Sequence, residues 1–530
     1  FLKDNFSVLS ESEKEDFLNK VNDIFSDINF YTCYYGISDE KLTGISYNNE
    51  LILKGLLLKS TSAIINAVYN SPDAEIRNTY ISLKQLRNSI AGAQGSESNT
   101  DILKKLEDQA NEMEKKLVKF SSEFAGIHHL FEYRWEDVRG ALKTDEAAIE
   151  FISFQEGLRF DTTVYGAIII TSDCKYPKTI RLFEESELNA MLGKATGTGY
   201  MYINKLYDKN SKEMYKLIWE PMEKELSGIN TVYYAPVGAL NKISFAALSK
   251  EPGNMLCDIY NIQQVSTTGK LIKQELKSEL KMTAAVFGGI DYNTDSVKLE
   301  AWKYLPCTLN EKNSIEKQLK KNKIACRGFS GKEAKEEQFK ELFDSTDTPS
   351  ILHVSTHGFF YPDPKQLKKE AEAKEEKIDF RGSSGFGNWM FLNNKNPMMR
   401  SGLVFAGANR VWSEDWGRTD NEGVLTAYEV SNMNMRNTDL VVLSACETGL
   451  GDIKGSEGVY GLQRAFKMAG VKYIIMSLWQ VPDKETVEFM EMFYKKLLKE
   501  KDVRMAFNET QKEMRKKYDP YFWAAFVLIE

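Results

Sequence analysis

Apolar residues recur three and four positions apart through roughly the first 135 residues, which is the spacing of one helix face. The stretch SESEKEDFLNKVNDIF, residues 10–25, adds a serine at the cap position and acidic residues in the first turn, both typical of a helix start. The polar segment AGAQGSESNT precedes a second long helical pattern at residues 100–124 and is typical of a turn between antiparallel helices. We therefore predict an all-α adaptor over residues 1–140. Its paired amphipathic helices also fit the remnant of a helical-repeat region, although we find no convincing repeat period.

From about residue 145 the pattern changes to short apolar runs rich in β-branched residues. These runs are AAIEFISF, VYGAIIIT, TVYYAPVG, AAVFGGI, SILHVSTHG, DLVVLSACETG and YIIMSLW, and helical patterns separate most of them. Strands that alternate with helices predict an α/β fold with a mostly parallel sheet flanked by helices. We divide this part into a companion lobe over residues 141–280 and a further domain over residues 281–530. A polar segment at 364–389 interrupts the latter, and we interpret it as a mobile surface insert.

The composition is that of a globular protein, with 42% hydrophobic and 27% charged residues among 530. A net charge of −7 argues against nucleic acid as the main ligand, because phosphate binding favours a basic surface. No apolar run reaches the roughly 18–20 residues of a membrane span, and ELILKGLLL is interrupted by Lys54. The six cysteines form no C-x-x-C pair, so we predict neither a disulfide framework nor a structural zinc site, and we expect a cytoplasmic location. The chain begins at Phe1 rather than Met, and we expect an N-terminal portion to precede it.

The stretch PSILHVSTHGFF, residues 349–360, places two of the four histidines four positions apart. Zinc-binding histidines at this spacing lie on a helix, usually beside a glutamate, whereas this run is β-branched and apolar. On a strand, His353 and His357 would lie about 13 Å apart, too far to share an ion, so we predict no metal site. We interpret His353, deep in the strand, as a packed core residue. His357 is the last residue before Gly358, at the carboxyl edge of the sheet, where open α/β sheets place their sites.

The run DLVVLSACETG places Cys446 at the end of another strand, before a glycine-rich loop and a helix. An isolated buried cysteine is more often a small hydrophobic residue than a nucleophile. However, if the strands that end in His-Gly and Ala-Cys are adjacent in one sheet, they bring an imidazole and a thiol to the same edge. The histidine would then promote the thiolate and protonate a leaving amine. Neither a phosphate-binding loop nor a Gly-x-Ser-x-Gly elbow is present, so we predict no cofactor and no serine hydrolase.

These strand ends resemble those of the caspase-like cysteine peptidases, and the wider pattern is similar to the CHAT family, whose caspase-like domains are associated with tetratricopeptide repeats. The similarity covers roughly residues 145–530. It runs in consistent order through YAPVGALNKISFAAL, YLPCTLNEKNSIEKQL, ILHVSTHG, RSGLVFAGAN, GVLTAYEVSNMNMRNTDLVVLSACETGLG, GSEGVYGLQRAFKMAGVKYIIMSLWQVPD and DPYFWAAFVLI. The resemblance implies a caspase-like α/β fold, with residues 281–530 as the catalytic domain and residues 141–280 as a degenerate, pseudo-peptidase-like lobe.

Carried over to this sequence, the resemblance implies that Cys446 is the nucleophile and His357 the general acid/base. The backbone N–H groups of Gly358 and Cys446 would form the oxyanion hole, which stabilises the charge that develops on the scissile carbonyl. Glycine suits the position after the histidine, because no side chain blocks the approach of a substrate there.

A substrate pocket is also implied. The segment SLWQVPD resembles the part of separase that helps to bind a basic P1 residue, which points to Asp483, with Trp479 as a wall. Glu447 and Asp452, in the loop after the cysteine, are further candidates to face a cationic side chain. An alternative that stays open is that Trp479 belongs to the core and that these carboxylates are solvated.

The function implied by the resemblance is a regulated cysteine endopeptidase that cleaves protein substrates, in bacterial defence or cell death. An activating protein or complex would bind through the N-terminal helices, and we expect neither nucleic acid nor a membrane as a partner. The segment at 364–389 would gate the cleft, be cut during maturation, or be a neutral surface loop. The alternative from a different class is a catalytically silent caspase-like scaffold for protein–protein interaction, against which the presence of both His357 and Cys446 argues.

Overall fold

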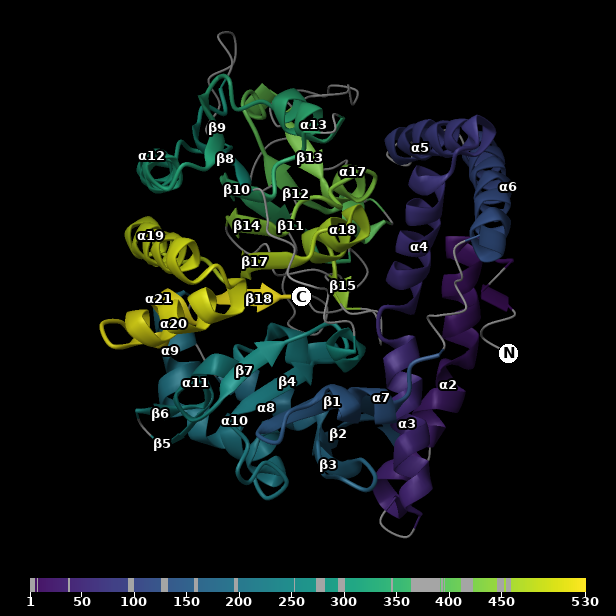
Figure 1. Cartoon of the computed structure of the whole chain (residues 1–530), viewed down its shortest axis with the longest axis vertical. Coiled ribbons are helices and arrows are strands. Elements are labelled where there is room, and N and C mark those ends of the chain that lie inside the picture. Colours follow the sequence, from purple (N-terminus) through teal and green to yellow (C-terminus); the bar gives the residue numbers. More distant parts are fainter. Residues whose placement is uncertain are drawn as a thin grey trace, which may run out of the picture.

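Three parts follow one another along the chain and can be told apart in Figure 1: a helical adaptor, a first lobe around one sheet, and a second lobe around another. The structure is a computed structural model. It describes residues 5–6, 8–36, 39–93, 100–124, 132–156, 161–194, 199–251, 253–272, 282–293, 301–344, 347–363, 391, 394, 396–410, 423–445, 452–453 and 459–530.

The adaptor consists of long amphipathic helices, as the pattern predicts. They are α2 (Glu11–Tyr35), α3 (Glu40–Leu53), α4 (Leu56–Asn70), α5 (Ala74–Ala93), α6 (Thr100–Phe124) and the short α7 (Trp135–Ala141). The serine predicted to start the first of them does so, because Ser10 and Glu13 exchange hydrogen bonds in a capping box. Helices α5 and α6 pack together on either side of the predicted turn.

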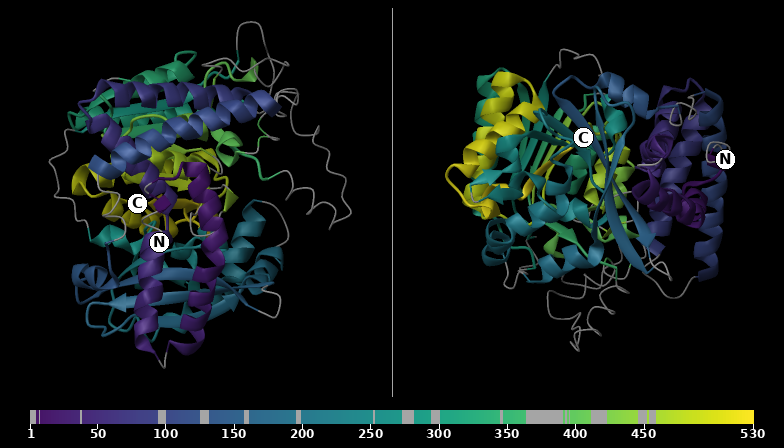
Figure 2. Two further views of the ribbon diagram at one scale, coloured as in Figure 1. Left: turned by 90° about the vertical axis from the view of Figure 1, so that its right-hand side faces the viewer. Right: turned by 90° about the horizontal axis from the view of Figure 1, so that it is seen from below.

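The adaptor runs along one side of both lobes, as the two turned views in Figure 2 show. Helix α2 packs on β1 (Glu146–Glu156) of the first lobe, whereas α4 packs on α18 (Leu462–Ala469) of the second. A partly buried ion pair between Glu11 and Arg464, 3.7 Å apart, adds a contact to the second lobe. The adaptor therefore touches both lobes directly.

The first lobe has a five-stranded sheet in the order β3-β2-β1-β4-β7. Strands β1, β4 and β7 run parallel to one another. Strand β2 runs antiparallel to both of its neighbours, β1 and β3, so this sheet is mixed. The reason is the short connection between β1 and β2, because parallel neighbours need a long crossover.

The remaining strand bounds are β2 (Thr162–Thr171), β3 (Lys178–Glu184), β4 (Thr231–Ala235) and β7 (Asn261–Gln264). Its other elements are α8 (Glu185–Lys194), α9 (Tyr200–Asn204), η2 (Lys205–Lys209), α10 (Ser211–Ile218), η3 (Glu220–Met222), η4 (Gly238–Lys242), η5 (Phe245–Ala247), β5 (Ser249–Glu251), β6 (Asn254–Met255), α11 (Leu256–Ile259) and η6 (Thr268–Leu271).

The second lobe has a six-stranded sheet in the order β18-β17-β14-β10-β8-β9, parallel except for β18 at one edge. The strands are β8 (Thr283–Ile290), β9 (Ala325–Gly331), β10 (Ile351–Ser355), β14 (Leu440–Ser444), β17 (Tyr473–Ser477) and β18 (Phe526–Ile529). A small sheet of β11 (Gly358–Phe360), β12 (Ser401–Val404) and β13 (Val424–Thr426) follows β10, and β15 (Asp452–Ile453) pairs with β16 (Val459–Tyr460). The helices are α12 (Pro306–Lys321), α13 (Glu336–Asp344), α17 (Ala427–Ser431), α18, α19 (Asp483–Glu500), α20 (Val503–Arg515) and α21 (Pro520–Trp523), with η7 (Pro397–Met399). The predicted mostly parallel sheet is present here.

Helices cover both faces of this six-stranded sheet, which explains why its strands are apolar along their whole length. Side chains on one face pack with α12 and α19, and those on the other with α13, α17 and α18. Along β10, Ile351 belongs to the first of these packed layers and Leu352 to the second. The α12–α19 layer continues without a break into the core of the first lobe, so the two lobes share one hydrophobic core.

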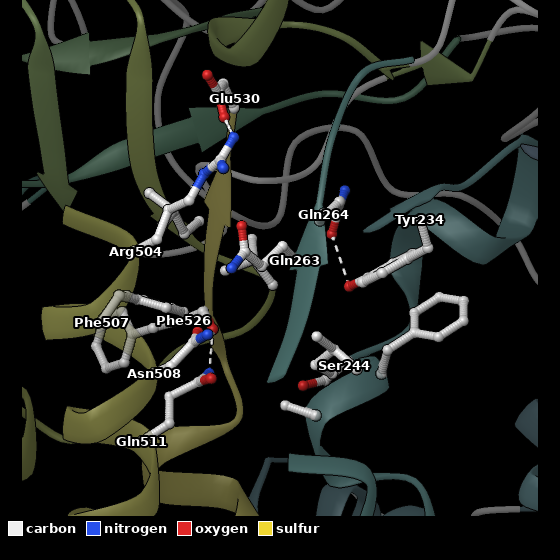
Figure 3. A pocket seen from close by; sticks show the side chains of 15 residues that line it. Tyr234, Ser244, Gln263, Gln264, Arg504, Phe507, Asn508, Gln511, Phe526 and Glu530 are labelled. Atoms are coloured by element: carbon white, nitrogen blue, oxygen red, sulfur yellow. Dashed lines mark hydrogen bonds and ion pairs between the residues drawn. The ribbon is translucent and has the colours of Figure 1, made fainter. Parts of the chain in front are cut away.

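A small cavity lies in the seam between the lobes, where β7 of the first lobe faces α20 and β18 of the second (Figure 3). Arg504 pairs with Glu530 on one side of it, and Tyr234 donates to Gln264 on the other, 3.3 Å apart. Its volume of about 40 Å³ has room for water but not for a peptide side chain, because ligand pockets hold roughly 300–1,000 Å³. None of the predicted site residues lines it.

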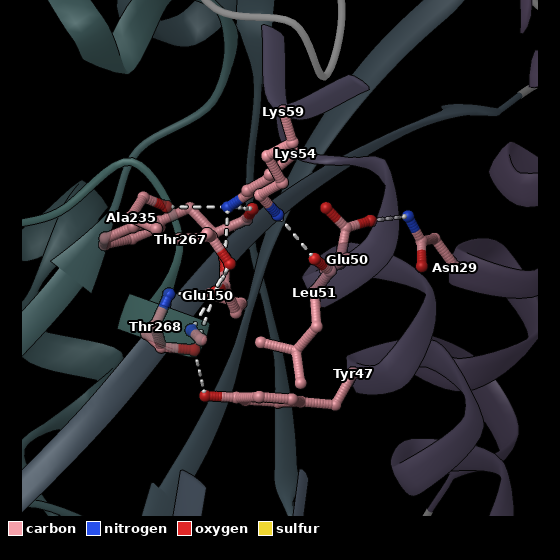
Figure 4. Close-up of polar contacts among 12 residues, drawn as sticks. Asn29, Tyr47, Glu50, Leu51, Lys54, Lys59, Glu150, Ala235, Thr267 and Thr268 are labelled. Atoms are coloured by element: carbon pink, nitrogen blue, oxygen red, sulfur yellow. Dashed lines mark hydrogen bonds and ion pairs between the residues drawn. The ribbon is translucent and has the colours of Figure 1, made fainter. Parts of the chain in front are cut away.

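A buried ion pair joins the adaptor to the first lobe (Figure 4). Lys54, in the break between α3 and α4, lies 2.7 Å from the carboxylate of Glu150 on β1, and both side chains are almost completely buried. The same ammonium group donates to the backbone carbonyls of Phe151 and Ala235, at 2.7 and 2.8 Å. The other carboxylate oxygen of Glu150 accepts from the backbone N–H and the hydroxyl of Thr268, each at 2.7 Å. The residue that interrupts the apolar run in the sequence is therefore the one that anchors the adaptor.

Among the residues that the structure describes, no single helix has both the length and the apolar composition of a membrane span. Helices α3 and α4 pass that test only as a pair, and they bend by 48° at the break that holds Lys54.

Candidate active site

The two strands that carry the predicted dyad are neighbours. Strands β10 and β14 are parallel and pair in register, with Ser355 opposite Ser444 at their carboxyl ends. In the sequence, His357 follows two residues after the first of these serines and Cys446 two residues after the second. Neighbouring strands lie about 4.8 Å apart. Cys446 itself lies outside the described residues, which stop at Ala445 on this strand.

The imidazole of His357 is held by backbone and by two aromatic rings. Its Nε2 lies 2.8 Å from the carbonyl oxygen of Lys303. Because a carbonyl only accepts, Nε2 carries the proton of this hydrogen bond, and in the neutral ring Nδ1 then carries the lone pair. The rings of Tyr292 and Trp302 lie on it with centroid distances of 5.1 and 5.2 Å.

This environment lowers the pKa of His357 from its usual value of 6.5. Burial is the largest cause, because it disfavours the charged imidazolium. The hydrogen bond to Lys303 and the negative charge of Asp483 act in the opposite direction and only partly offset the burial. The ring is therefore mostly neutral at pH 7, which is the form that a general base needs.

The chain turns sharply after β10, and three hydrogen bonds fix the turn. The hydroxyl of Thr356 donates to the carbonyl of Val404, and it lies 2.9 Å from the hydroxyl of Tyr292. The N–H of Val404 donates to the carbonyl of His357, at 3.0 Å. Gly358 then begins β11 opposite Leu403 and is half-buried. The histidine and the glycine thus stand where the large sheet passes into the small one.

Asp483 lies at the edge of the sheet that holds His357. It is the first residue of α19, directly after the loop that follows β17, and it is partly buried. Burial raises the pKa of its carboxyl group, the negative charge of Glu311 raises it further, and His357 lowers it. The two predicted residues His357 and Asp483 therefore influence each other electrostatically across the strand ends.

Trp479 lies in the seam between the lobes. Its ring stacks on that of Tyr207 in the first lobe, with centroids 5.6 Å apart. Its indole N–H donates to the carbonyl of Tyr521, at 3.0 Å. These contacts account for the packing role that the sequence leaves open for this residue, and its role as a pocket wall stays a prediction.

The other predicted site residues lie partly or wholly outside the residues that the structure describes. Glu447 and the insert at 364–389 are outside the described residues. The backbone of Asp452 is described, in β15 opposite Tyr460 of β16, but its side chain is not.

His353, interpreted from the sequence as a core residue, is completely buried. Its Nε2 lies 3.0 Å from a carboxylate oxygen of Glu311 on α12, and its Nδ1 lies 3.3 Å from the hydroxyl of Tyr494 on α19. The second carboxylate oxygen of Glu311 accepts from the hydroxyl of Ser355, at 2.8 Å. The core interpretation of His353 is confirmed, and its polar atoms are satisfied, as burial requires.

The groups that sequence reasoning missed are those that hold His357. The carbonyl of Lys303 has no sequence signature, because every residue carries a backbone carbonyl. Tyr292 and Trp302 lie more than fifty positions before the histidine and belong to no motif of catalytic residues. Only the fold brings them to the strand end.

Comparison with known proteins gives one family model that matches, the CHAT domain, over residues 208–530. Tetratricopeptide repeat protein 28 from Homo sapiens is 32% identical over 111 residues, and the Mus musculus protein 31% over the same length. Each match covers 20% of this chain but only 4% of the relative, so the chain spans a small part of the length of these curated proteins.

Similar solved structures include the Arg-specific cysteine proteinase gingipain R, at 12% identity and a TM-score of 0.34, covering 61% of this chain and 66% of that one. The separase–securin complex of Saccharomyces cerevisiae is similar at 9% identity and a TM-score of 0.42, covering 88% of this chain and 34% of that one.

The predicted recognition and the predicted fold class, an α/β fold of the caspase-like type behind an all-α region, are confirmed by the family match together with the sheet topology. The matched residues make up more than half of the chain and include both strand ends of the candidate site. This chain belongs to the CHAT domain family.

Proposed function

We propose that this chain is a cysteine endopeptidase in which His357 and Cys446 form the catalytic dyad. The observation that carries the proposal is the in-register pairing of β10 with β14, because it gives the two residues equivalent positions after the ends of adjacent parallel strands. The lowered pKa of His357 is a second support, since a neutral imidazole accepts a proton from a thiol. Membership in the CHAT family is the third.

The proposed chemistry has two half-reactions. His357 takes the proton of the Cys446 thiol, and the thiolate attacks the scissile carbonyl to form a tetrahedral oxyanion. The imidazolium then gives its proton to the leaving amine, which departs and leaves a thioester on Cys446. Water hydrolyses this acyl-enzyme, again with His357 as the base, and the thiol is restored. The backbone N–H groups of Gly358 and Cys446 are the proposed donors to the oxyanion.

We propose that the substrate is a protein cut after a basic residue. Asp483 supports this, because its carboxylate lies near enough to His357 to affect its pKa and is only partly buried. Trp479, Glu447 and Asp452 are the further candidates for this pocket. Arginine fits a carboxylate partner best, because its guanidinium donates two parallel hydrogen bonds.

We propose further that a protein partner bound to the adaptor regulates the enzyme. The contact of α4 with α18 supports this, because α18 follows the loop after Cys446 in the sequence. The insert at 364–389 as a gate or a cleavage site, and a role in bacterial defence or cell death, are finer proposals that rest on the family resemblance alone.

The test is labelling with a peptide that carries arginine next to an electrophile reactive towards thiols. The whole chain should be labelled once per molecule, and Cys446→Ala should not be labelled. His357→Gln should lose labelling by on the order of 10²–10⁴-fold in rate, the usual contribution of general acid–base catalysis. Cys307→Ala is the matched control, because Cys307 is a partly exposed cysteine of the same lobe and should leave the labelling unchanged.

Specificity is read from a peptide library. Cleavage after arginine or lysine, lost in Asp483→Ala, supports the proposed pocket, whereas cleavage after apolar or acidic residues that Asp483→Ala leaves intact refutes it. Absence of labelling at Cys446, with and without co-expressed proteins encoded by neighbouring genes, would favour a silent scaffold for protein binding over a peptidase.

A further inference from the structure

The motif RSGLVFAGAN takes part in the family resemblance but has no role in the proposed chemistry. It forms β12 and the turn after it, and it ends at Asn409. The side chain of Asn409 is completely buried. A buried amide is retained at a cost unless its donors and acceptor find partners, so its contacts indicate what it does.

The side chain of Asn409 forms hydrogen bonds with both the backbone N–H and the backbone carbonyl of Trp302. Its side-chain oxygen accepts from the N–H of Trp302 at 2.8 Å, and its side-chain nitrogen donates to the carbonyl of the same residue at 3.1 Å. Only an amide supplies a donor and an acceptor in this geometry among side chains of this size. The next residue along the chain is Lys303, whose carbonyl accepts from Nε2 of His357.

The same asparagine also holds the other segment that covers His357. Its backbone N–H donates to the carbonyl of Tyr292, at 2.9 Å. Its side-chain nitrogen donates to the side-chain oxygen of Asn293, also at 2.9 Å. Tyr292 and Trp302 are the two rings that lie on the imidazole of His357. Asn409 therefore links the two stretches of chain that, with the carbonyl of Lys303, fix this imidazole.

We propose that Asn409 is a positioning residue for His357: it sets the place of the Lys303 carbonyl and of both covering rings, and so the orientation of the imidazole. Calling this orientation catalytic rests on the proposed function. The placement itself does not. The residue touches neither the imidazole nor the expected position of a substrate in any described contact, so it acts through Trp302, Lys303 and Tyr292.

Loss of the hydrogen bonds of the Asn409 side chain should change the pKa of His357. The groups that act on its charge are Tyr292 and Trp302 by burial, the carbonyl of Lys303 by its hydrogen bond, and Asp483 at the start of α19 by its charge. Burial is the largest of these effects and lowers the pKa. When the two segments loosen, water reaches the ring, and the pKa rises towards 6.5.

The experiment measures the titration of His357 by NMR in the whole chain with isotope-labelled histidine. The chain has four histidines, so the spectrum is simple, and His357→Gln assigns the signal. The test variant is Asn409→Leu, whose side chain has nearly the same shape but forms no hydrogen bonds, while its backbone N–H can still donate to Tyr292. The control is Asn29→Leu in the adaptor, because Asn29 is also a buried asparagine and is hydrogen-bonded to Glu50 and Ser46.

We expect the titration midpoint of His357 to lie below 6.5 in the unchanged chain and in Asn29→Leu, and to move up towards 6.5 in Asn409→Leu. With a peptidase substrate, kcat should fall on the order of 10²-fold in Asn409→Leu with little change in KM, as for a misplaced catalytic group. If Asn409→Leu fails to fold, the milder Asn293→Ala decides, since it removes only one of the hydrogen bonds of Asn409 and should move the midpoint in the same direction.

An unchanged midpoint in a folded Asn409→Leu, or an equal shift in Asn29→Leu, overturns the proposal, because either result means that Asn409 serves stability only. A shifted midpoint in a chain that shows no peptidase activity in any form has a different meaning. The positioning by Asn409 then stands, and the proposed function fails.

Discussion

The parallel strand pairs β1–β4 and β10–β14 use polar groups in opposite ways. In the first lobe, Glu150 of β1 is buried with Lys54 of the adaptor, and backbone and hydroxyl groups satisfy both. In the second lobe, β10 is followed by His357, which one carbonyl holds through a single nitrogen and which stays partly exposed. Lys54 and Glu150 have all their polar groups paired, and together they anchor the adaptor to the first lobe. The imidazole of His357 has one hydrogen bond with the residues that the structure describes and can take up and release a proton, which makes it a candidate for chemistry.

The largest effect is expected at the anchor. Replacing Lys54 by methionine leaves the Glu150 carboxylate buried without its cation, which costs about 3–5 kcal/mol in the free energy of unfolding. The double variant Lys54→Met/Glu150→Leu should recover most of this loss, because no charge is then left uncompensated. Chemical unfolding of the whole chain measures both. If the double variant is as unstable as the single one, the ion pair is not the basis of the anchor.

A smaller effect separates His353, on β10, from His357, which follows that strand. His353→Leu removes the ring that partners Glu311 and Tyr494, and we expect the free energy of unfolding to fall by about 1–3 kcal/mol. His357→Gln, four positions further on, should cost less than about 1 kcal/mol and should instead slow thiol labelling by on the order of 10²–10⁴-fold. Equal losses of stability in the two variants would contradict the division between a structural and a chemical histidine.

The smallest effect is a shift in pH dependence. The neutral form of His357 is the proposed base, so activity should rise as pH increases through a pKa that burial holds below 6.5. Asp483→Asn removes a negative charge that raises this pKa, so the acid limb of the pH–rate profile should move to lower pH. Asp502→Asn, a change to an exposed cap of α20, serves as a control that should leave the limb in place. A limb that moves upward in Asp483→Asn would show that the two groups are not coupled as described.

The same linkage applies to stability. Because the folded chain disfavours the protonated ring, the contribution of His357 to stability is complete above 6.5 and is lost as pH falls from 6.5 through the lowered pKa.

Much of the second lobe was predictable from the sequence, because its strands are continuous apolar runs with informative ends. The His-Gly and Ala-Cys ends indicated that two strands share an edge, and the pairing of Ser355 with Ser444 confirms that β10 and β14 are adjacent. The core role of His353 followed from its place in the middle of a strand and is confirmed.

The rest could not be predicted because it depends on contacts between distant segments. Lys54 interrupts an apolar run, but nothing near it in the sequence points to Glu150 as its partner. The carbonyl of Lys303 and the rings over His357 come from a stretch with no recognisable motif. The antiparallel pairing of β1 with β2 did have a signal, the short link between them, and it makes the sheet of the first lobe mixed.

The shared core between the lobes has a practical consequence for anyone who wishes to shorten this protein. A fragment that starts near residue 281 would keep every proposed catalytic residue, yet it would uncover the faces of Trp479, Phe507 and Phe526 that now meet the first lobe. Such a surface favours aggregation. The first lobe thus keeps these apolar side chains of the second lobe away from water.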